Sequence, residues 1–250
     1  MTTPTAKVAL VTGGNKGIGL AIVRGLARAG MTVLMGSRDL ARGEAAAAAL
    51  VAEIGVPAAR VRPVRLDVAA QDDVDALALL VASDYGKLDV LVNNAGVSVL
   101  DVRTMDHLPK PTEETVDDIR HVYEVNVFAV VRMMNAFLPL LGKAEAPRVV
   151  NVTSKRGSIG EEGAWVGQPS MSYSSSKTAL NALTVHYARE FAGTALKVNG
   201  AAPGHVATGF NDFRGTRTPD EGAAVAIRLA TLGPDGPTGE VYEDDTRLSW

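Results

Sequence analysis

The chain has 250 residues, 46% of them hydrophobic, which is enough for one large core, and one domain is the usual outcome for an α/β chain of this size. Its net charge is −3 with both signs interspersed, which argues against a nucleic-acid or membrane partner. It has no cysteine, which excludes disulfides and thiolate metal sites, and its four histidines show no metal-ligand spacing. The apolar run before Gly13 is too short for a signal peptide, so we expect a cytoplasmic protein without a metal site.

Short strand-like runs alternate with longer helical patterns along the chain. We predict strands at Val8–Thr12, Thr32–Gly36, Val61–Leu66, Val90–Asn93, Val149–Thr153, Lys197–Asn199 and Glu240–Tyr242. We predict helices at Ile18–Ala29, Ala41–Ile54, Gln71–Asp84, Glu113–Leu141 (as one helix or two), Ser172–Phe191 and Pro219–Leu232. Several strands are apolar without clean alternation, as strands covered on both faces are. The pattern predicts a single α/β domain over residues 1–250, a doubly wound parallel sheet of about seven strands with helices on both faces.

The longest apolar stretch, Val125–Leu141, lies in one of these predicted helices. It carries Asn126, Arg132 and Asn135. Because three polar side chains interrupt it, we predict a buried helix and not a membrane span.

The first predicted strand runs through a glycine-rich turn into a helix. Gly13 permits a tight turn, while Gly17 and Gly19 let backbone and helix approach a pyrophosphate, which the positive end of the helix attracts. A purely structural turn is the simpler alternative, but the strand–turn–helix context favours a nucleotide site. We expect the cofactor to contact Gly13, Asn15, Lys16, Gly17, Ile18 and Gly19.

The second predicted strand ends at Ser37-Arg38, where a fold that selects NAD places Asp or Glu on the ribose hydroxyls. Arg38 is suited to bind a 2′-phosphate in a bidentate manner, and Lys16 approaches the same position from the glycine loop. Asp39 lies one residue past the expected acidic position and complicates the choice. Two solvated cations are the alternative, but the pair favours NADPH over NADH.

Tyr173 and Lys177 lie four residues apart on a predicted helix, so they share one face. A cation beside a phenol favours the phenolate, which would lower the pKa of Tyr173 and allow proton exchange near neutral pH. An exposed pair on a solvated helix is the alternative. Because the same chain has a nucleotide site, the pair indicates hydride transfer coupled to proton transfer.

These motifs follow one another in a fixed order along the chain. They are Thr12-Gly-x-x-x-Gly-Ile-Gly19, Asp67-Val68, Asn93-Asn-Ala-Gly96, Asn126, Ser154, Tyr173-x-x-x-Lys177 and Pro203-Gly204…Thr208. In this order they resemble the short-chain dehydrogenase/reductase family over essentially the whole chain. The glycine loop and Ser37-Arg38-Asp39 are most similar to the NADPH-dependent carbonyl reductases. The resemblance implies a Rossmann-type fold and carbonyl reduction.

The resemblance also implies residue roles. Ser154 would hydrogen-bond the substrate carbonyl, and Tyr173 would be the general acid. Lys177 would lower the Tyr173 pKa and hold the nicotinamide ribose, and Asn126 would hold a water in a proton relay to Lys177. Thr153 is the rival of Ser154, but the motif favours Ser154. Further cofactor contacts would come from Asp67, Val68, Asn94, Ala95, Gly96, Pro203, Gly204, Val206 and Thr208.

Three features depart from the family, and all concern substrate and assembly. The gap from Ser154 to Tyr173 is 19 residues, longer than is common, and the extra residues 155–169 are expected to border the pocket. The segment Gly209–Thr218 is short where many relatives carry a helical lid. The chain ends in Glu240-Val-Tyr-Glu-Asp-Asp before its last residues, in place of a glycine-rich tail. We therefore expect an open apolar cleft for bulky carbonyl substrates, bordered by Trp165, His205 and Phe210.

The leading prediction is an NADPH-dependent reductase of ketones and aldehydes that acts on small molecules. One alternative is a dedicated biosynthetic ketoreductase for acyl-carrier or polyketide substrates, in which Arg156, Arg214 and Arg217 would bind a phosphopantetheine phosphate. Another is a non-catalytic NADPH-sensing protein, which would have no need for an intact acid/base set. On the helix from Ser172, the small residues Ala179 and Ala182 with Leu183 allow close packing and predict a homodimer or homotetramer.

Overall fold

The computed structural model describes residues 6–99, 109–161 and 169–249. The strands are β1 (Val8–Val11), β2 (Thr32–Ser37), β3 (Val61–Arg65), β4 (Val90–Asn93), β5 (Arg148–Val152), β6 (Lys197–Ala202), β7 (Val241–Glu243) and β8 (Thr246–Arg247). The α-helices are α1 (Gly17–Arg28), α2 (Leu40–Ile54), α3 (Gln71–Asp84), α4 (Val116–Tyr123), α5 (Ala129–Leu141), α6 (Met171–Glu190) and α7 (Pro219–Ala230). Short helical turns are η1 (Ala58–Arg60), η3 (Glu124–Phe128) and η4 (Lys155–Gly157).

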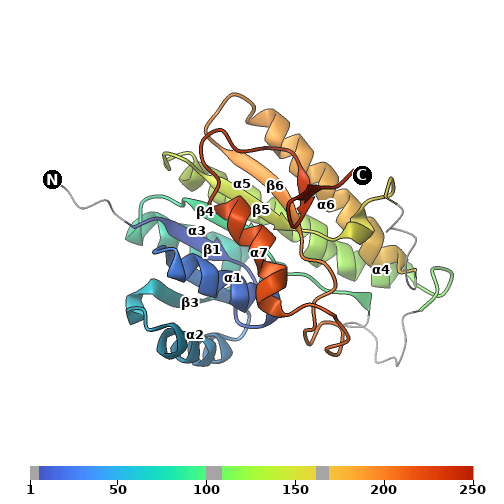
Figure 1. Ribbon diagram of the computed structural model, residues 1–250, viewed down its shortest axis with the longest axis horizontal. Coiled ribbons are helices and arrows are strands. Elements are labelled where there is room, and N and C mark those ends of the chain that lie inside the picture. Colours follow the sequence, from blue (N-terminus) through green and yellow to red (C-terminus); the bar gives the residue numbers. More distant parts are fainter. Residues whose placement is uncertain (1–5, 100–108, 162–168, 250) are drawn as a thin grey trace.

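The strands form one sheet in the order β3-β2-β1-β4-β5-β6-β7-β8, with helices on both faces (Figure 1). Every neighbouring pair is parallel except β7 and β8. The direction of strand order reverses between β1 and β4, so the predicted doubly wound fold is confirmed. Since the carboxyl ends of parallel strands meet at one edge, the loops after β1, β2, β4, β5 and β6 lie along the same edge of the sheet.

The seven predicted strands and all predicted helices are confirmed to within three residues at each end. The eighth strand, β8, was not predicted. It has two residues, Thr246 and Arg247, and pairs antiparallel with β7. A strand of two residues is too short to show a periodic pattern in the sequence.

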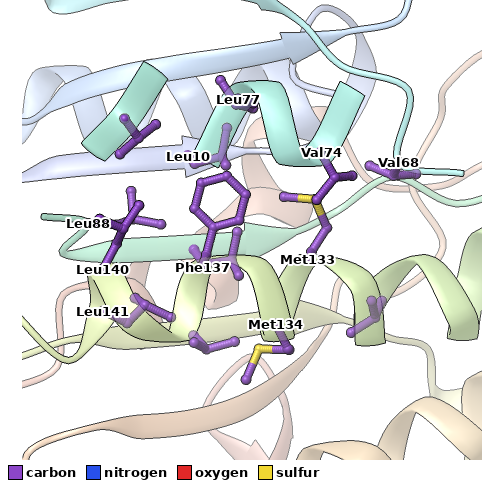
Figure 2. Close-up of a cluster of buried hydrophobic side chains, with 14 of the residues drawn as sticks. Leu10, Val68, Val74, Leu77, Leu88, Met133, Met134, Phe137, Leu140 and Leu141 are labelled. Atoms are coloured by element: carbon purple, nitrogen blue, oxygen red, sulfur yellow. The ribbon is translucent and has the colours of Figure 1, made fainter. Parts of the chain in front are cut away.

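Alternation along β1 explains the two layers of helices. Val8 and Leu10 belong to one buried core cluster, while Ala9 and Val11 belong to the other. The first cluster is filled mainly from α3 and α5, with Phe137 and Met133 between strands and helix (Figure 2). The second is filled mainly from α1, α2 and α7. The strands are therefore apolar on both faces, as the sequence indicated.

The predicted helix at Glu113–Leu141 begins at Val116 and is one helical run with a change of winding. Helix α4 passes into a π turn, Glu124–Phe128, in which the Ala129 N–H donates to the carbonyl of Glu124, and then into α5. The run is long and apolar enough to cross a membrane, but half of its most apolar 18-residue window is buried within the domain. Phe137 is fully buried in the core, as expected for a core helix.

Candidate active site

The glycine turn between β1 and α1 makes contacts that a larger residue would block. Gly13 and Gly17 have positive φ angles of 61° and 54°. A Cβ added at Gly19 would lie 2.2 Å from the Gly13 carbonyl oxygen. Lys16 is the exposed N-cap residue of α1, and its side chain makes no capping bond. The first amides of α1 therefore remain able to bind an anion at the positive helix end, as predicted for a pyrophosphate.

Thr12 and Asn94 fix this turn to the end of β4. The Thr12 Oγ1 accepts the N–H groups of Asn94 and Ala95, both at 2.9 Å. The Asn94 side-chain amide donates to the carbonyls of Thr12 at 2.8 Å and Gly13 at 3.2 Å. Asn94 therefore braces the glycine turn, and the loops after β1 and β4 form one unit at the point where strand order reverses.

The end of β2 separates a buried serine from an exposed arginine. Ser37 is buried, and its hydroxyl donates to the Asp39 carbonyl at 2.7 Å, whereas Arg38 is exposed. The Asp39 carboxylate caps α2, because it accepts the Arg42 N–H at 3.2 Å and pairs with the Arg42 Nε at 3.2 Å. The Asp39 carboxylate is thus bound at the start of α2. It is therefore less available than Arg38 to contact the adenosine ribose of the cofactor.

Two further loops complete the predicted cofactor side. After β3, Asp67 Oδ1 accepts the Ala69 N–H at 3.0 Å, and Val68 is buried. After β6, Pro203 and Val206 are buried and Gly204 has a φ of 75°. A Cβ added at Gly17 would lie 3.3 Å from Cγ2 of Thr208, so the loop after β6 faces the glycine turn. Of the predicted glycine-loop residues, Asn15 and Ile18 are partly buried there.

Ser154, Tyr173 and Lys177 come together beyond the end of β5. Lys177 Nζ donates to the Val152 carbonyl at 2.9 Å and lies 5.7 Å from the centre of the Tyr173 ring. The Ser154 hydroxyl hydrogen-bonds the Tyr173 phenol. Thr153, the rival of Ser154, is buried and directs its hydroxyl to Asn181 Oδ1 at 2.7 Å, away from the phenol. The geometry therefore favours Ser154, as the family motif does.

Asn126 lies within the π turn between α4 and α5. Its Oδ1 accepts the Val97 N–H at 2.9 Å, and its Nδ2 donates to the Val97 carbonyl and to Ser176 Oγ, both at 3.0 Å. A Cβ added at Gly96 would lie 3.3 Å from Asn126 Oδ1 and 3.6 Å from Lys177 Nζ. Asn126 and Lys177 therefore flank Gly96, while the water-holding role of Asn126 stays a prediction.

Burial governs the pKa of both residues of the acid/base pair. It lowers the pKa of Lys177 to about 8. It raises the pKa of Tyr173, an effect opposed by the hydrogen bond from Ser154 and by the charge of Arg156. The prediction of a lowered Tyr173 pKa is wrong for the chain by itself, because burial disfavours the phenolate more than its neighbours favour it.

The depressed pKa of Lys177 predicts a pH-dependent stability. Between about pH 8 and 10.5 the folded protein binds fewer protons at this site than the unfolded chain, so the unfolding free energy rises with pH across that window. Below pH 8 the full cost of burying the cation is present. Lys177→Met should therefore stabilise the protein at pH 7 by up to about 3 kcal/mol. The difference should shrink toward pH 10.5, as measured by urea unfolding.

The control for this measurement is Lys143→Met, at an exposed position, which should leave the unfolding free energy nearly unchanged. A difference between wild type and Lys177→Met that stays constant with pH would contradict the lowered pKa of Lys177.

Glu114, which we did not predict, caps the helix that carries the pair. Its Oε1 accepts the Met171 N–H at 2.7 Å and its Oε2 accepts the Ser172 N–H at 2.8 Å. The side chain is nearly buried, so its charge meets the positive end of α6 at low solvent screening. Sequence spacing does not reveal this contact, because 57 residues separate Glu114 from Met171.

Glu114→Gln should loosen the first turn of α6, two residues before Tyr173. We expect the unfolding free energy to fall by about 1 kcal/mol and kcat by roughly five- to tenfold. Glu113→Gln is the matched control, because the Glu113 carboxylate accepts from the Lys110 N–H and not from α6. Equal losses of kcat in both variants would show that the cap does not position Tyr173.

The predicted pocket residues are only partly accounted for. The Phe210 ring lies 5.6 Å from the Tyr173 ring and is 42% exposed. His205 is exposed on the loop after β6. Trp165 lies outside the described residues. Phe213 lies on the same short segment as Phe210 and was not among the predicted pocket residues. It is 71% exposed and has a φ of 59°.

Comparison with known proteins agrees with this arrangement. The family model described as short chain dehydrogenase matches residues 7–218. Carbonyl reductase [NADPH] 1 of Homo sapiens is 32% identical over 289 residues, which cover 97% of this chain and 98% of that protein. The 3-oxoacyl-[acyl-carrier-protein] reductase of Synechocystis sp. is 35% identical over 208 residues, covering 83% and 77% respectively. An NADPH-bound short chain oxidoreductase from Pseudomonas aeruginosa PAO1 has a TM-score of 0.82 at 28% identity, covering 95% and 94%.

Proposed function

The chain belongs to the short-chain dehydrogenase/reductase family, and we propose on that premise that it reduces ketones and aldehydes to alcohols. It is an oxidoreductase that uses NADPH/NADP⁺. The observation that carries the proposal is the meeting of Ser154, Tyr173 and Lys177 at the same edge of the sheet as the glycine turn. A protein that only sensed NADPH would have no use for this acid/base pair, in which Lys177 is buried and Tyr173 is partly buried.

NADPH supplies the hydride in this reaction. The first amides of α1 would hold its pyrophosphate, and Arg38 with Lys16 would hold the 2′-phosphate. Lys177 would contact the nicotinamide ribose, and the loop from Pro203 would lie against the carboxamide.

The chain's own residues would then handle the substrate oxygen. Ser154 would donate a hydrogen bond to the carbonyl, and Tyr173 would donate its proton to the forming alkoxide. The raised pKa of Tyr173 keeps the phenol protonated near neutral pH, which is the form that a general acid needs.

We propose bulky, apolar carbonyl compounds as substrates. Phe210 packs against Tyr173, and Phe213 is exposed on the same short segment, so an apolar surface adjoins the acid. A screen of NADPH oxidation over aryl ketones, quinones, terpenoid ketones and small polar carbonyls tests this proposal. Reduction of one small polar carbonyl with rejection of all bulky compounds would contradict it.

A dedicated biosynthetic ketoreductase is the second candidate, favoured by the similarity to the acyl-carrier reductase of Synechocystis. Two of the three arginines proposed to bind phosphopantetheine are engaged in ion pairs, because Arg214 pairs with Asp212 and Arg217 pairs with Asp244. Arg156, the third, is partly buried and its charge favours the Tyr173 phenolate. Including an acetoacetyl thioester with and without phosphopantetheine in the same screen separates the two candidates.

We predict a homodimer or homotetramer that forms through α5 and α6. Ala179, Ala182 and Leu183 are partly exposed on α6, and Phe128, the last residue of the π turn before α5, is 48% exposed. These small and apolar side chains allow two copies of the helix pair to pack closely. Light scattering at micromolar concentration should give a mass of at least twice 26.1 kDa, and a mass of one chain would contradict the prediction. The cytoplasmic setting also stays a prediction.

A further inference from the structure

The chain ends in a hairpin that replaces the expected glycine-rich tail. Strands β7 and β8 pair at Glu243 and Thr246, and the turn between them is Asp244-Asp245. Asp244 has a φ of 50°, a conformation that Asp and Asn adopt more readily than most residues. The two carboxylates of this turn project to different partners.

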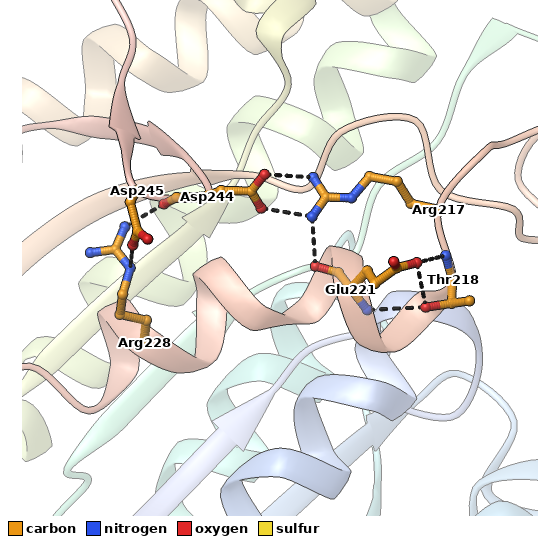
Figure 3. Close-up of polar contacts among 6 residues, drawn as sticks. All are labelled: Arg217, Thr218, Glu221, Arg228, Asp244 and Asp245. Carbon is orange, nitrogen blue, oxygen red and sulfur yellow. Dashed lines mark hydrogen bonds and ion pairs between the residues drawn. The ribbon is translucent and has the colours of Figure 1, made fainter.

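Asp244 binds Arg217 through both of its oxygens. Arg217 Nη1 donates to Oδ2 at 3.2 Å and Nη2 donates to Oδ1 at 2.7 Å, as Figure 3 shows. Arg217 Nη2 also donates to the Glu221 carbonyl in the first turn of α7. The neighbouring Asp245 instead pairs with Arg228 of α7 at 3.3 Å (Figure 3). A planar guanidinium held on two sides has a fixed orientation.

Arg217 in turn holds the loop after β6 by its backbone and its side chain. Its N–H donates to the His205 carbonyl at 3.0 Å, and its carbonyl accepts the Ala207 N–H at 2.8 Å. Its side chain lies against Gly204, where an added Cβ would be 2.8 Å from Nη1. Gly204 is therefore packed directly beneath the guanidinium that Asp244 fixes.

A second contact of the hairpin reaches the other side of the site. Glu243 pairs with Lys155 at 3.6 Å, and Lys155 follows Ser154 directly. Beyond β8, Ser249 donates through its N–H at 2.8 Å and its hydroxyl at 2.6 Å to Glu161 Oε1, and its carbonyl accepts from the Ser158 hydroxyl. The C-terminal residues thus connect the loop after β6 with the segment after Ser154.

We propose that the C-terminal hairpin positions the nicotinamide side of the active site, with Asp244 and Arg217 as positioning residues for the loop 203–208. This inference rests on the proposed placement of the nicotinamide against that loop. The pair acts on the cofactor through Gly204 and the two backbone bonds of Arg217. Loosening the pair should release the loop and weaken NADPH binding, while the distance between Tyr173 and Lys177 on α6 stays unchanged.

The test compares Asp244→Asn with Asp245→Asn. Asparagine keeps the shape and the positive φ of the turn, and both variants remove one charge from the same hairpin. The first readout is deuterium exchange at the amides of Ala207 and Arg217 in the chain without added cofactor. The second is the Kd for NADPH, followed by nicotinamide fluorescence. Asp244→Asn should accelerate exchange and raise the Kd by roughly three- to tenfold, with kcat nearly unchanged, whereas Asp245→Asn should match wild type.

Rescue by the conservative variant separates positioning from general stability. Asp244→Glu keeps a carboxylate for Arg217 and should restore most of the slow exchange and tight binding. If Asp244→Asn matches wild type in both readouts, or if Asp245→Asn changes them equally, the inference is wrong although the enzyme still binds NADPH. If wild type itself does not bind NADPH, the proposed cofactor site fails, and faster exchange in Asp244→Asn would support only the bracing of the loop.

Discussion

Replacing Tyr173 by phenylalanine is expected to lower kcat by about a hundredfold or more, with NADPH binding nearly unchanged. The phenol is the group that the Ser154 hydroxyl bonds, and it would supply the proton to the alkoxide. Phenylalanine keeps the ring that packs on Phe210 and faces Lys177. The fall in kcat would therefore come from the missing proton donor and not from altered packing. Steady-state kinetics and cofactor titration provide the two measurements.

Tyr187 offers a control on the same helix. Its hydroxyl donates to Asn135 Oδ1 at 3.2 Å on the surface, so Tyr187→Phe removes a phenol of the same kind from α6. This variant should keep wild-type turnover. Turnover of Tyr173→Phe at the wild-type rate would show that another group supplies the proton.

Exchanging Ser37 for aspartate and Arg38 for leucine is expected to reverse the choice between NADPH and NADH. A charge-assisted contact from Arg38 to the 2′-phosphate is worth about 1.5–3 kcal/mol, or roughly a ten- to hundredfold preference for NADPH. An aspartate at position 37 would accept from the ribose hydroxyls and repel the phosphate. The measurement is kcat/KM with each cofactor for wild type, the double variant and Arg38→Leu alone.

The single variant separates loss of attraction from gain of a new contact. Arg38→Leu should lose the NADPH preference without better use of NADH, and only the double variant should favour NADH. Since Ser37 is buried and bonds the Asp39 carbonyl, thermal unfolding must accompany the kinetics to confirm an intact fold. A wild-type enzyme that prefers NADH would overturn the Arg38 argument and would require Asp39 to leave its capping position at α2.

The sequence determines most of the fold through local apolar patterns. The Val90–Asn93 strand was predicted to the residue, because an apolar run there is bounded by polar residues. The β6 strand was predicted three residues too short, since Gly200, Ala201 and Ala202 have weak strand propensity. Pairing with β5 on one side and β7 on the other extends this strand, and such tertiary support is not visible locally.

For the candidate site, the motifs identified side chains but not their surroundings. Tyr173 and Lys177 were found by spacing, yet their pKa values depend on burial by distant segments. Glu114 and Asp244 form hydrogen bonds with residues far away in the sequence, so no local sequence pattern predicts these contacts. The order of the motifs predicted which loops lie at the same edge of the sheet, because parallel strands place their carboxyl ends together. The contacts that orient those loops required the structure.

The π turn at Glu124–Phe128 has a consequence for insertions and deletions in this helix. A deletion within an ordinary α-helix turns every later side chain by about 100° and would rotate the buried face of α5 toward solvent. Here the wide turn already accommodates one residue more than α winding needs. Losing one residue at this turn would restore plain α winding and leave Val122 and Phe137 facing the core. The Asn126 side chain would lose its hydrogen bond with the Val97 backbone. A change of length at this turn would therefore alter the chemistry of the site without disturbing the packing of the domain. Packing and site chemistry can change independently at this one position of the helix.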